Sequence, residues 1–150
     1  MTEPAPPDVI VNAEDFPWAD AGELERAVRH VLASQGVEAC EISLTLLDDD
    51  DIRTLNHRYL GRNRPTDVIA FALEPGPSLL GDLYLGVDQA RRQAEEVGVP
   101  LAEELVRLAV HGTLHVLGHD HPEGEGREES PMFVLQEALV RGIRGEPAGR

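Results

Sequence analysis

The segment His111-Gly-Thr-Leu-His115-Val-Leu-Gly118-His119-Asp120-His121 holds four of the six histidines of this chain within eleven residues. His111 and His115 are four residues apart, so on a helix their side chains lie on one face, one turn apart. Gly118 predicts the end of that helix, because glycine adopts a positive φ without steric cost. The chain can then turn back and bring His121 next to the first two histidines.

Three neutral imidazoles on one ion leave a coordination position for water, which is the arrangement of a catalytic zinc site. A structural site would need a fourth protein ligand. The pattern therefore predicts that His111, His115 and His121 bind one zinc ion per chain, although nickel and copper also accept imidazole ligands. We expect His119 to point into solvent. Asp120 is either an acceptor that orients a ligand imidazole or a turn residue.

The spacing H-x3-H-x2-G-x2-H equals that of the metzincin motif H-E-x-x-H-x-x-G-x-x-H. Gly112 follows the first histidine, where the peptidase motif has the glutamate that acts as general base. A metallopeptidase is therefore one alternative, and it would lack its proton acceptor. A small-molecule metal hydrolase is another alternative, and it would need a deep apolar pocket.

Composition limits the class of protein. A length of 150 residues predicts a single domain over 1–150, and we expect flexible tails at 1–7 and 145–150. The 13 basic and 28 acidic residues give a net charge of −15, which excludes a protein that coats nucleic acid or membrane through bulk charge. The basic residues are all arginines, so a local phosphate site would present planar guanidinium groups.

The compartment is inferred from cysteine use and from the N-terminal residues. Cys40 is the only cysteine, which excludes an intrachain disulfide. Residues 1–8 are acidic and rich in proline, unlike a signal peptide, and no apolar run approaches the ~18 residues of a membrane span. We therefore expect a cytoplasmic protein with no membrane partner.

Hydrophobic periodicity and capping residues predict nine elements in the order βαβαββααα. We expect strands at 8–12, 41–47, 67–73 and 81–87, the last two as an antiparallel hairpin. We expect helices at 20–35, from 48–51 through 59, from a cap at Asp88 to Gly98, from Pro100 through His115, and after a cap at Ser130. The aspartates at 48–51 favour helix capping, with a carboxylate metal site as the alternative. This order indicates an α+β fold in which helices, including the metzincin-like metal-binding helix, pack on a small mixed β-sheet.

The histidine segment resembles the H-G-x-L-H-L-x-G-x-D-H signature of the YbeY family of metal-dependent endoribonucleases. The segment LNHRYLGRNRPTDVIAF at 55–71 is similar to that family's L-N-x-x-Y-R-x-x-D-x-P-T-D-V-L-S-F block. Residues 80–83 and 132–139 are similar to its L-G-D-I strand and its final helix. The likeness covers about residues 42 to 140 and implies a single YbeY-like α+β domain with a zinc-like site.

The resemblance also implies a function. It implies a single-strand-specific, metal-dependent endoribonuclease that acts in ribosomal RNA processing and ribosome quality control. Its partners would be ribosomal RNA and the small ribosomal subunit. A non-catalytic ribosome-assembly factor with a structural metal is the alternative that retains these partners.

One family position differs in this chain. The family usually has a catalytic arginine directly after the tyrosine of the second block, and Leu60 stands there. Arg58, Arg62 and Arg64 lie nearby, and we expect all three to contact phosphate or RNA. We expect Arg62 to act in catalysis together with His111, by neutralising charge that develops on the phosphate while the ion activates water or a phosphate oxygen. The negative net charge predicts weak activity on free RNA and the need for a docked partner.

Overall fold

The computed structural model describes residues 7–73, 79–121 and 126–145, and within these ranges the elements follow the predicted order. The strands are β1 (Asp8–Asn12), β2 (Cys40–Leu47), β3 (Val68–Leu73) and β4 (Leu79–Gly86). The helices are α1 (Ala21–Ser34), α2 (Asp49–Leu60), α3 (Val87–Val97), α4 (Leu101–Val116) and α5 (Pro131–Arg144). Most of the two predicted tails, 1–6 and 146–150, lies outside the described residues.

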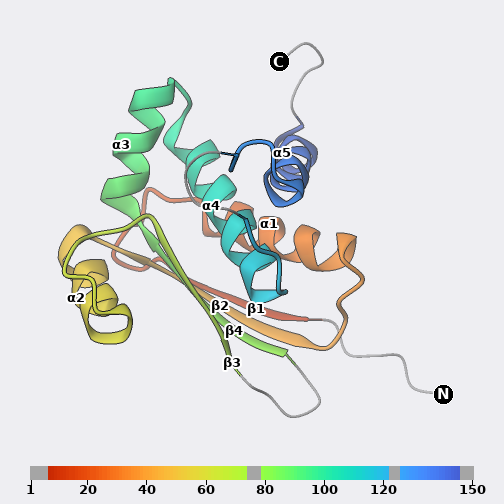
Figure 1. Cartoon of the computed structure of the whole chain (residues 1–150), viewed down its shortest axis with the longest axis horizontal. Helices are drawn as coiled ribbons and strands as arrows, with labels where there is room; N and C mark the ends of the chain where they lie inside the picture. Colours follow the sequence, from red (N-terminus) through yellow and green to blue (C-terminus); the bar gives the residue numbers. More distant parts are fainter. Residues whose placement is uncertain (1–6, 74–78, 122–125, 146–150) are drawn as a thin grey trace.

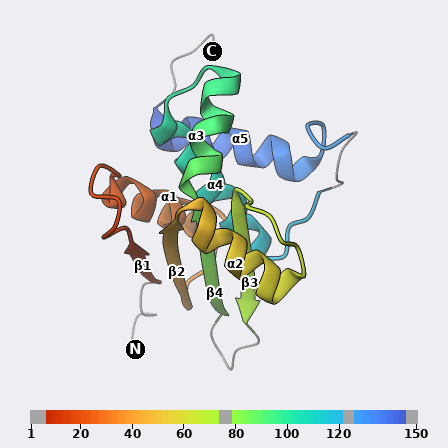
Figure 2. The same ribbon diagram turned by 90° about the vertical axis from the view of Figure 1, so that its left-hand side faces the viewer.

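The four strands form one mixed sheet in the order β1-β2-β4-β3 (Figure 2). β1 and β4 both pair with β2 in parallel, whereas β3 pairs with β4 antiparallel. The predicted small mixed sheet and the antiparallel pairing of its last two strands are therefore confirmed, while the connection at 74–78 lies outside the described residues. Because β3 is an edge strand, one of its sides is not occupied by a neighbouring strand of this sheet.

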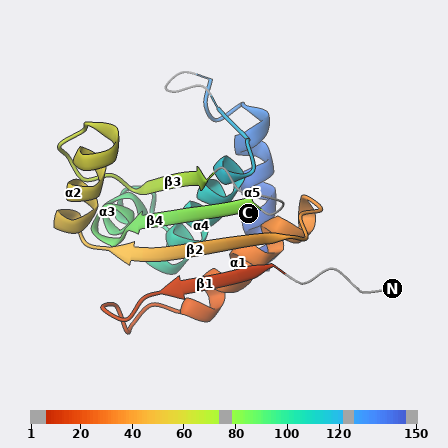
Figure 3. The same cartoon turned by 90° about the horizontal axis from the view of Figure 1, so that it is seen from below.

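The core lies between one face of the sheet and the helices α1 and α4. In Figures 1 and 3 these helices and α5 lie on the same side of the strands, and α2 lies at one end of the sheet. Alternate strand residues point into this layer, as the period of two requires. The buried core includes Ile42, Leu44, Leu83, Leu85, Val28, Val31, Leu105 and Leu114. Each such side chain contributes roughly 1.5–3 kcal/mol of burial free energy.

Side-chain caps start three helices where the sequence places them. Asp20 accepts a hydrogen bond from the backbone N–H of Glu23, and Asp48 accepts one from Asp51. Ser130 accepts one from the N–H of Phe133, with Pro131 as the first helical residue. Each cap stabilises its helix by about 1 kcal/mol. Asp48 thus acts as the predicted N-cap.

The prediction that Asp88 caps α3 is wrong. β4 continues directly into α3, so Gly86 takes the N-cap position and makes no side-chain cap. A Cβ at Gly86 would overlap the carbonyl oxygen of Thr66, which explains why glycine stands at this junction. Asp88 instead lies in the first turn of α3 and accepts a hydrogen bond of 2.9 Å from the N–H of Asp49, the first residue of α2.

The longest helix of the described residues, α4, has 16 residues. A membrane-spanning helix needs about 20 predominantly apolar residues. Within 7–73, 79–121 and 126–145, no helix has the length and apolarity that a membrane span requires.

Candidate metal centre

Three histidines meet at the end of α4. His111 and His115 lie in its last turns, and Nε2 of His115 is 3.0 Å from Nε2 of His111. Gly118 has a φ of 97°, which lets the chain reverse and return His121 to the helix. One ring nitrogen from each of the three histidines lies within 4.8 Å of the other two. The structure therefore brings together all three residues that the spacing assigned to one metal ion.

The donor set fits a divalent metal ion. Zinc binds imidazole nitrogens at about 2.0–2.1 Å, which places neighbouring ligand atoms of a tetrahedral ion roughly 3.4 Å apart. The separation of 3.0 Å between His111 and His115 and the limit of 4.8 Å for all three histidines are compatible with that value. Among the residues that the structure describes, this group has three members and no fourth His, Cys, Asp or Glu ligand. Three imidazoles with a coordination position left over are typical of a catalytic site.

A buried glutamine orients the first ligand. Oε1 of Gln136 on α5 lies 2.6 Å from Nδ1 of His111. The amide of Gln136 donates to Oε2 of Glu137 at 3.0 Å, so its carbonyl oxygen is the atom that faces the imidazole. Nδ1–H of His111 therefore donates to Gln136, and Nε2 is left as the lone-pair donor for a metal.

The glutamine is held in turn by a half-buried ion-pair cluster. Arg107 on α4 bonds Glu103 and Glu104 of its own helix, each at 3.0 Å, and Glu137 of α5 at 2.9 Å. A continuous chain of hydrogen bonds therefore runs from Arg107 through Glu137 and Gln136 to His111. It ties the orientation of the imidazole to the packing of α5 on α4.

Burial keeps the two helical histidines neutral. His111 is only 7% exposed, and burial lowers its pKa to about 4, although the bond to Gln136 opposes the shift. Burial also lowers the pKa of His115, and the nearby His121 lowers it further. Neutral imidazole is the form that coordinates a metal ion, so the two helical histidines are in the binding form at neutral pH.

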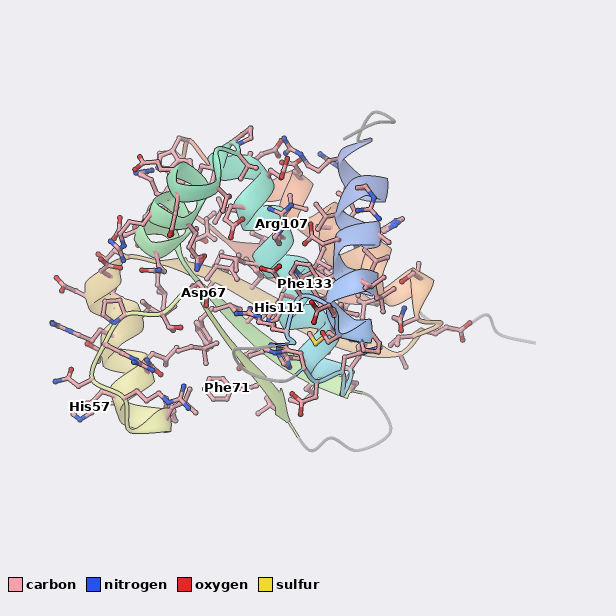
Figure 4. All side chains as sticks on the ribbon, turned by 45° about the horizontal axis from the view of Figure 1, so that its top comes forward. His57, Asp67, Phe71, Arg107, His111 and Phe133 are labelled. Carbon is pink, nitrogen blue, oxygen red and sulfur yellow. The ribbon has the colours of Figure 1, made fainter. Side chains whose placement is uncertain are left out.

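The histidines open into a cleft of about 340 Å³. Its lining consists of Asp67, Val68, Ala70, His111, His115, His121 and Arg127. Val68 and Ala70 belong to β3, so the cleft runs along the edge strand of the sheet. In Figure 4, Asp67 lies toward His111 from the start of this strand.

The three arginines near the second block lie elsewhere. Arg58 is on α2, Arg62 and Arg64 are in the turn that follows it, and all three are exposed. The turn is held by Asn56, which donates to the carbonyl oxygen of Arg64 at 2.9 Å. Within the described residues, the cleft at the histidines is not lined by any of these arginines, and none of them forms an ion pair.

The remaining residues of the histidine segment have local roles. Nε2 of His119 lies 3.1 Å from Oε1 of Gln35, so His119 is partly buried rather than free in solvent. Oδ1 of Asp120 accepts a hydrogen bond of 2.9 Å from the N–H of His121. Asp120 is therefore a turn residue that shapes the return of the chain. The exposed His57 projects from α2, away from His111 (Figure 4).

Close packing explains why glycine stands at position 112. A Cβ at this position would lie 3.0 Å from Cδ2 of Leu83 and 3.2 Å from Cγ2 of Val68. α4 thus crosses the sheet so closely that a side chain at this position would require Leu83 and Val68 to shift. The glutamate that the peptidase motif carries here would press against the same two side chains of β3 and β4.

Sequence reasoning missed two residues of the site. Gln136 is a buried polar residue in a helix whose other buried residues are Met132, Leu139 and Val140, and that mismatch was the available signal. Arg127 lines the cleft beside the three histidines, and no ion-pair partner for it occurs in the described parts of the chain. Its position between α4 and α5 has no sequence signature.

A mixed sheet and three converging histidines, two of them on α4, define an α+β domain with a candidate metal centre. The family model described as Endoribonuclease YbeY matches residues 10–144. This chain belongs to the YbeY endoribonuclease family, as its motifs predicted. The family is one of endoribonucleases, hydrolases that act on RNA.

Individual relatives agree with this assignment. Endoribonuclease YbeY of Moorella thermoacetica is 44% identical over 144 residues, which cover 86% of this chain and 91% of that protein. The same-named protein of Bacillus licheniformis is 40% identical, with 89% and 91% covered. The solution structure of TM1509 from Thermotoga maritima has a TM-score of 0.63 at 23% identity, with 95% and 99% covered, and this likeness supports the α+β fold.

Proposed function

We propose that this protein is a single-strand-specific, metal-dependent endoribonuclease that acts in ribosomal RNA maturation and ribosome quality control. The observation that carries the proposal is the convergence of His111, His115 and His121 within 4.8 Å, in a chain that belongs to the YbeY family. Zinc is the proposed ion, because three imidazoles suit it. The proposed partners are ribosomal RNA and the small ribosomal subunit, and the proposed location is the cytoplasm.

The residues at the cleft have different proposed roles. His111, His115 and His121 hold the ion, and Gln136 keeps Nε2 of His111 turned toward it. When bound, a divalent ion supplies Lewis-acid activation of a phosphodiester and of water. Arg127 lines the same cleft, so its guanidinium group is placed to neutralise charge on the phosphate.

The exposed arginines Arg58, Arg62 and Arg64 bind phosphate groups of the RNA backbone at a distance from the ion. Their side chains face solvent, so they are available to phosphate groups that lead to or from the cleft. The sequence predicts a catalytic role for Arg62, whereas its place outside the cleft lining favours contact with the RNA backbone. The net charge of −15 makes unassisted RNA binding weak, which supports the need for a docked partner.

The test uses the purified chain stripped of metal and then reloaded with zinc. We expect cleavage of a single-stranded ribosomal RNA fragment, little cleavage of a duplex of the same sequence, and no cleavage after chelation. In cells that carry only the His111→Ala variant, ribosomal RNA ends should be incompletely processed. Normal ends in those cells, or equal cleavage with and without metal, would contradict the proposal. If the unmodified protein supports normal ribosomal RNA maturation in cells but the purified protein cleaves no RNA, a non-catalytic assembly factor would be favoured.

A further inference from the structure

A second cavity, of about 490 Å³, adjoins the cleft of the histidines. It shares three lining residues with that cleft, namely Asp67, His111 and Arg127. Most of its other lining residues belong to α3, α4 and α5. The labelled residues Arg107, Phe133 and His111 all line this cavity, and in Figure 4 they lie close together where α4 and α5 meet. A molecule bound at the histidines therefore has direct access to this cavity.

One part of the wall is apolar and includes an aromatic ring. Phe133 of α5 is half-buried and lines the cavity together with Val97, Val99 and Leu108. Apolar walls with a few placed polar groups are typical of sites for small planar ligands. An aromatic face in particular accepts a nucleobase by stacking, whatever the base.

Gln93 of α3 also lines the cavity, and it carries a hydrogen-bond acceptor without a partner. Nε2 of Gln93 on α3 donates to Oδ2 of Asp67 at 3.1 Å. A carboxylate only accepts, so the amide cannot be turned over, and the carbonyl oxygen Oε1 must face away from Asp67. This Oε1 is buried, and in the described residues it is the one buried side-chain polar atom without a partner. A buried polar atom of this kind points to a missing donor.

The charges around the cavity also favour a hydrogen-bond donor. Glu104 and Glu137 form ion pairs with Arg107. Glu96 and Glu128 also line the cavity and add further carboxylate oxygens. This surplus of acceptor oxygens disfavours a phosphate group inside the cavity. It suits an uncharged ring whose edge carries N–H groups.

We propose that the cavity is a nucleobase subsite that takes a base with an exocyclic amino group in preference to uracil. This inference rests on the proposed function, because it places an RNA phosphate at the histidines. The neighbouring base turns into the cavity and stacks on Phe133, and its amino group donates to Oε1 of Gln93. Uracil has a carbonyl oxygen where cytosine has the amino group, so it would set one acceptor against another.

The test compares matched nucleotides on the zinc-loaded protein. CMP and UMP share the sugar and phosphate, and differ at the base in the amino or carbonyl group. AMP and IMP form a second such pair. In NMR titrations we expect CMP and AMP to bind about five- to tenfold more tightly than UMP and IMP. They should also shift the side-chain amide of Gln93 and the ring of Phe133.

Variants separate the subsite from the phosphate site. Gln93→Leu should remove the preference for CMP over UMP and leave zinc affinity unchanged, whereas Phe133→Ala should weaken both nucleotides equally. Gln89→Leu is the matched control on the same helix, because Gln89 binds Arg92 and does not line the cavity, and it should keep the preference.

Equal affinities for CMP and UMP in the unmodified protein would overturn the subsite. Shifts confined to the histidines would overturn it as well. The titration needs no cleavage, so a protein that discriminates CMP from UMP but cuts no RNA would refute the proposed function alone. A protein that cuts RNA without base preference, with Gln93→Leu unchanged, would refute the subsite alone.

Discussion

The histidine segment at the end of α4 and the arginine-rich turn after α2 are both prominent in the sequence, but the structure treats them differently. His111 and His115 lie on a core helix, and Gln136 and the Arg107 cluster hold the first of them in place. The arginines are exposed, and only the backbone of their turn is held, by Asn56. The comparison teaches that regular spacing on a helix fixes side-chain geometry, whereas closeness along a turn does not.

Removal of one ligand should give the largest difference between the two regions. We expect His115→Ala to lower zinc affinity by at least about 100-fold and to abolish RNA cleavage, because two imidazoles cannot hold a catalytic ion firmly. His57→Ala on α2 is the matched control and should leave both unchanged, since His57 is exposed and outside the cleft. Isothermal titration with zinc and a cleavage assay measure the two effects. Full zinc affinity in His115→Ala would refute the triad.

Loss of the orienting residue tests how firmly each region is held. Gln136→Leu should lower zinc affinity about 10- to 100-fold, because Nδ1–H of His111 loses its acceptor and the ring loses its orientation. Gln136→Glu retains the acceptor for Nδ1–H but loses the donor to Glu137, so it should recover part of the affinity. Asn56→Ala should instead leave zinc affinity unchanged and lower the free energy of unfolding by about 1–3 kcal/mol, since it exposes an unpaired carbonyl in the turn. Equal zinc affinity in Gln136→Leu and the unmodified protein would contradict the orienting role.

The two sets of arginines should separate in steady-state kinetics. We expect Arg127→Ala to lower kcat for RNA cleavage about tenfold or more, because its guanidinium group lines the metal cleft. Arg62→Ala should mainly raise KM, by less than about threefold, since Arg62 would contact only the phosphate backbone of the RNA. Arg127→Lys keeps the charge and should restore part of kcat. A larger loss of kcat in Arg62→Ala than in Arg127→Ala would reverse the assignment.

Two glycines provide the smallest test of the comparison. Gly112→Ala should lower the free energy of unfolding by about 1 kcal/mol, because the contact of its Cβ with Leu83 and Val68 outweighs the higher helix propensity of alanine. Gly61→Ala should lower it by about 1 kcal/mol, through its φ of +70° alone, since no atom lies within 4 Å of the added Cβ. Denaturant unfolding monitored by circular dichroism measures both. An unchanged free energy of unfolding in Gly112→Ala would show that α4 and the sheet leave space for a Cβ at this position.

Much of the fold follows from local patterns. The elements, the caps at Asp20, Asp48 and Ser130, and the mixed sheet agree with the structure because they depend on side chains within a few residues. The cap at Asp88 failed because the end of β4 cannot be read from propensity alone. There β4 passes directly into α3, and Asp88 binds the start of α2 instead.

The ligand set of the metal centre was accessible from the chain alone, because a helix turn and a glycine bend place His111, His115 and His121 together by short-range geometry. The environment of these ligands was not accessible. Gln136 meets His111 across 25 residues, and Arg127 and Gln93 reach the clefts only because α3, α4 and α5 pack as they do. Such contacts depend on the combined burial of many distant side chains, which no local spacing encodes.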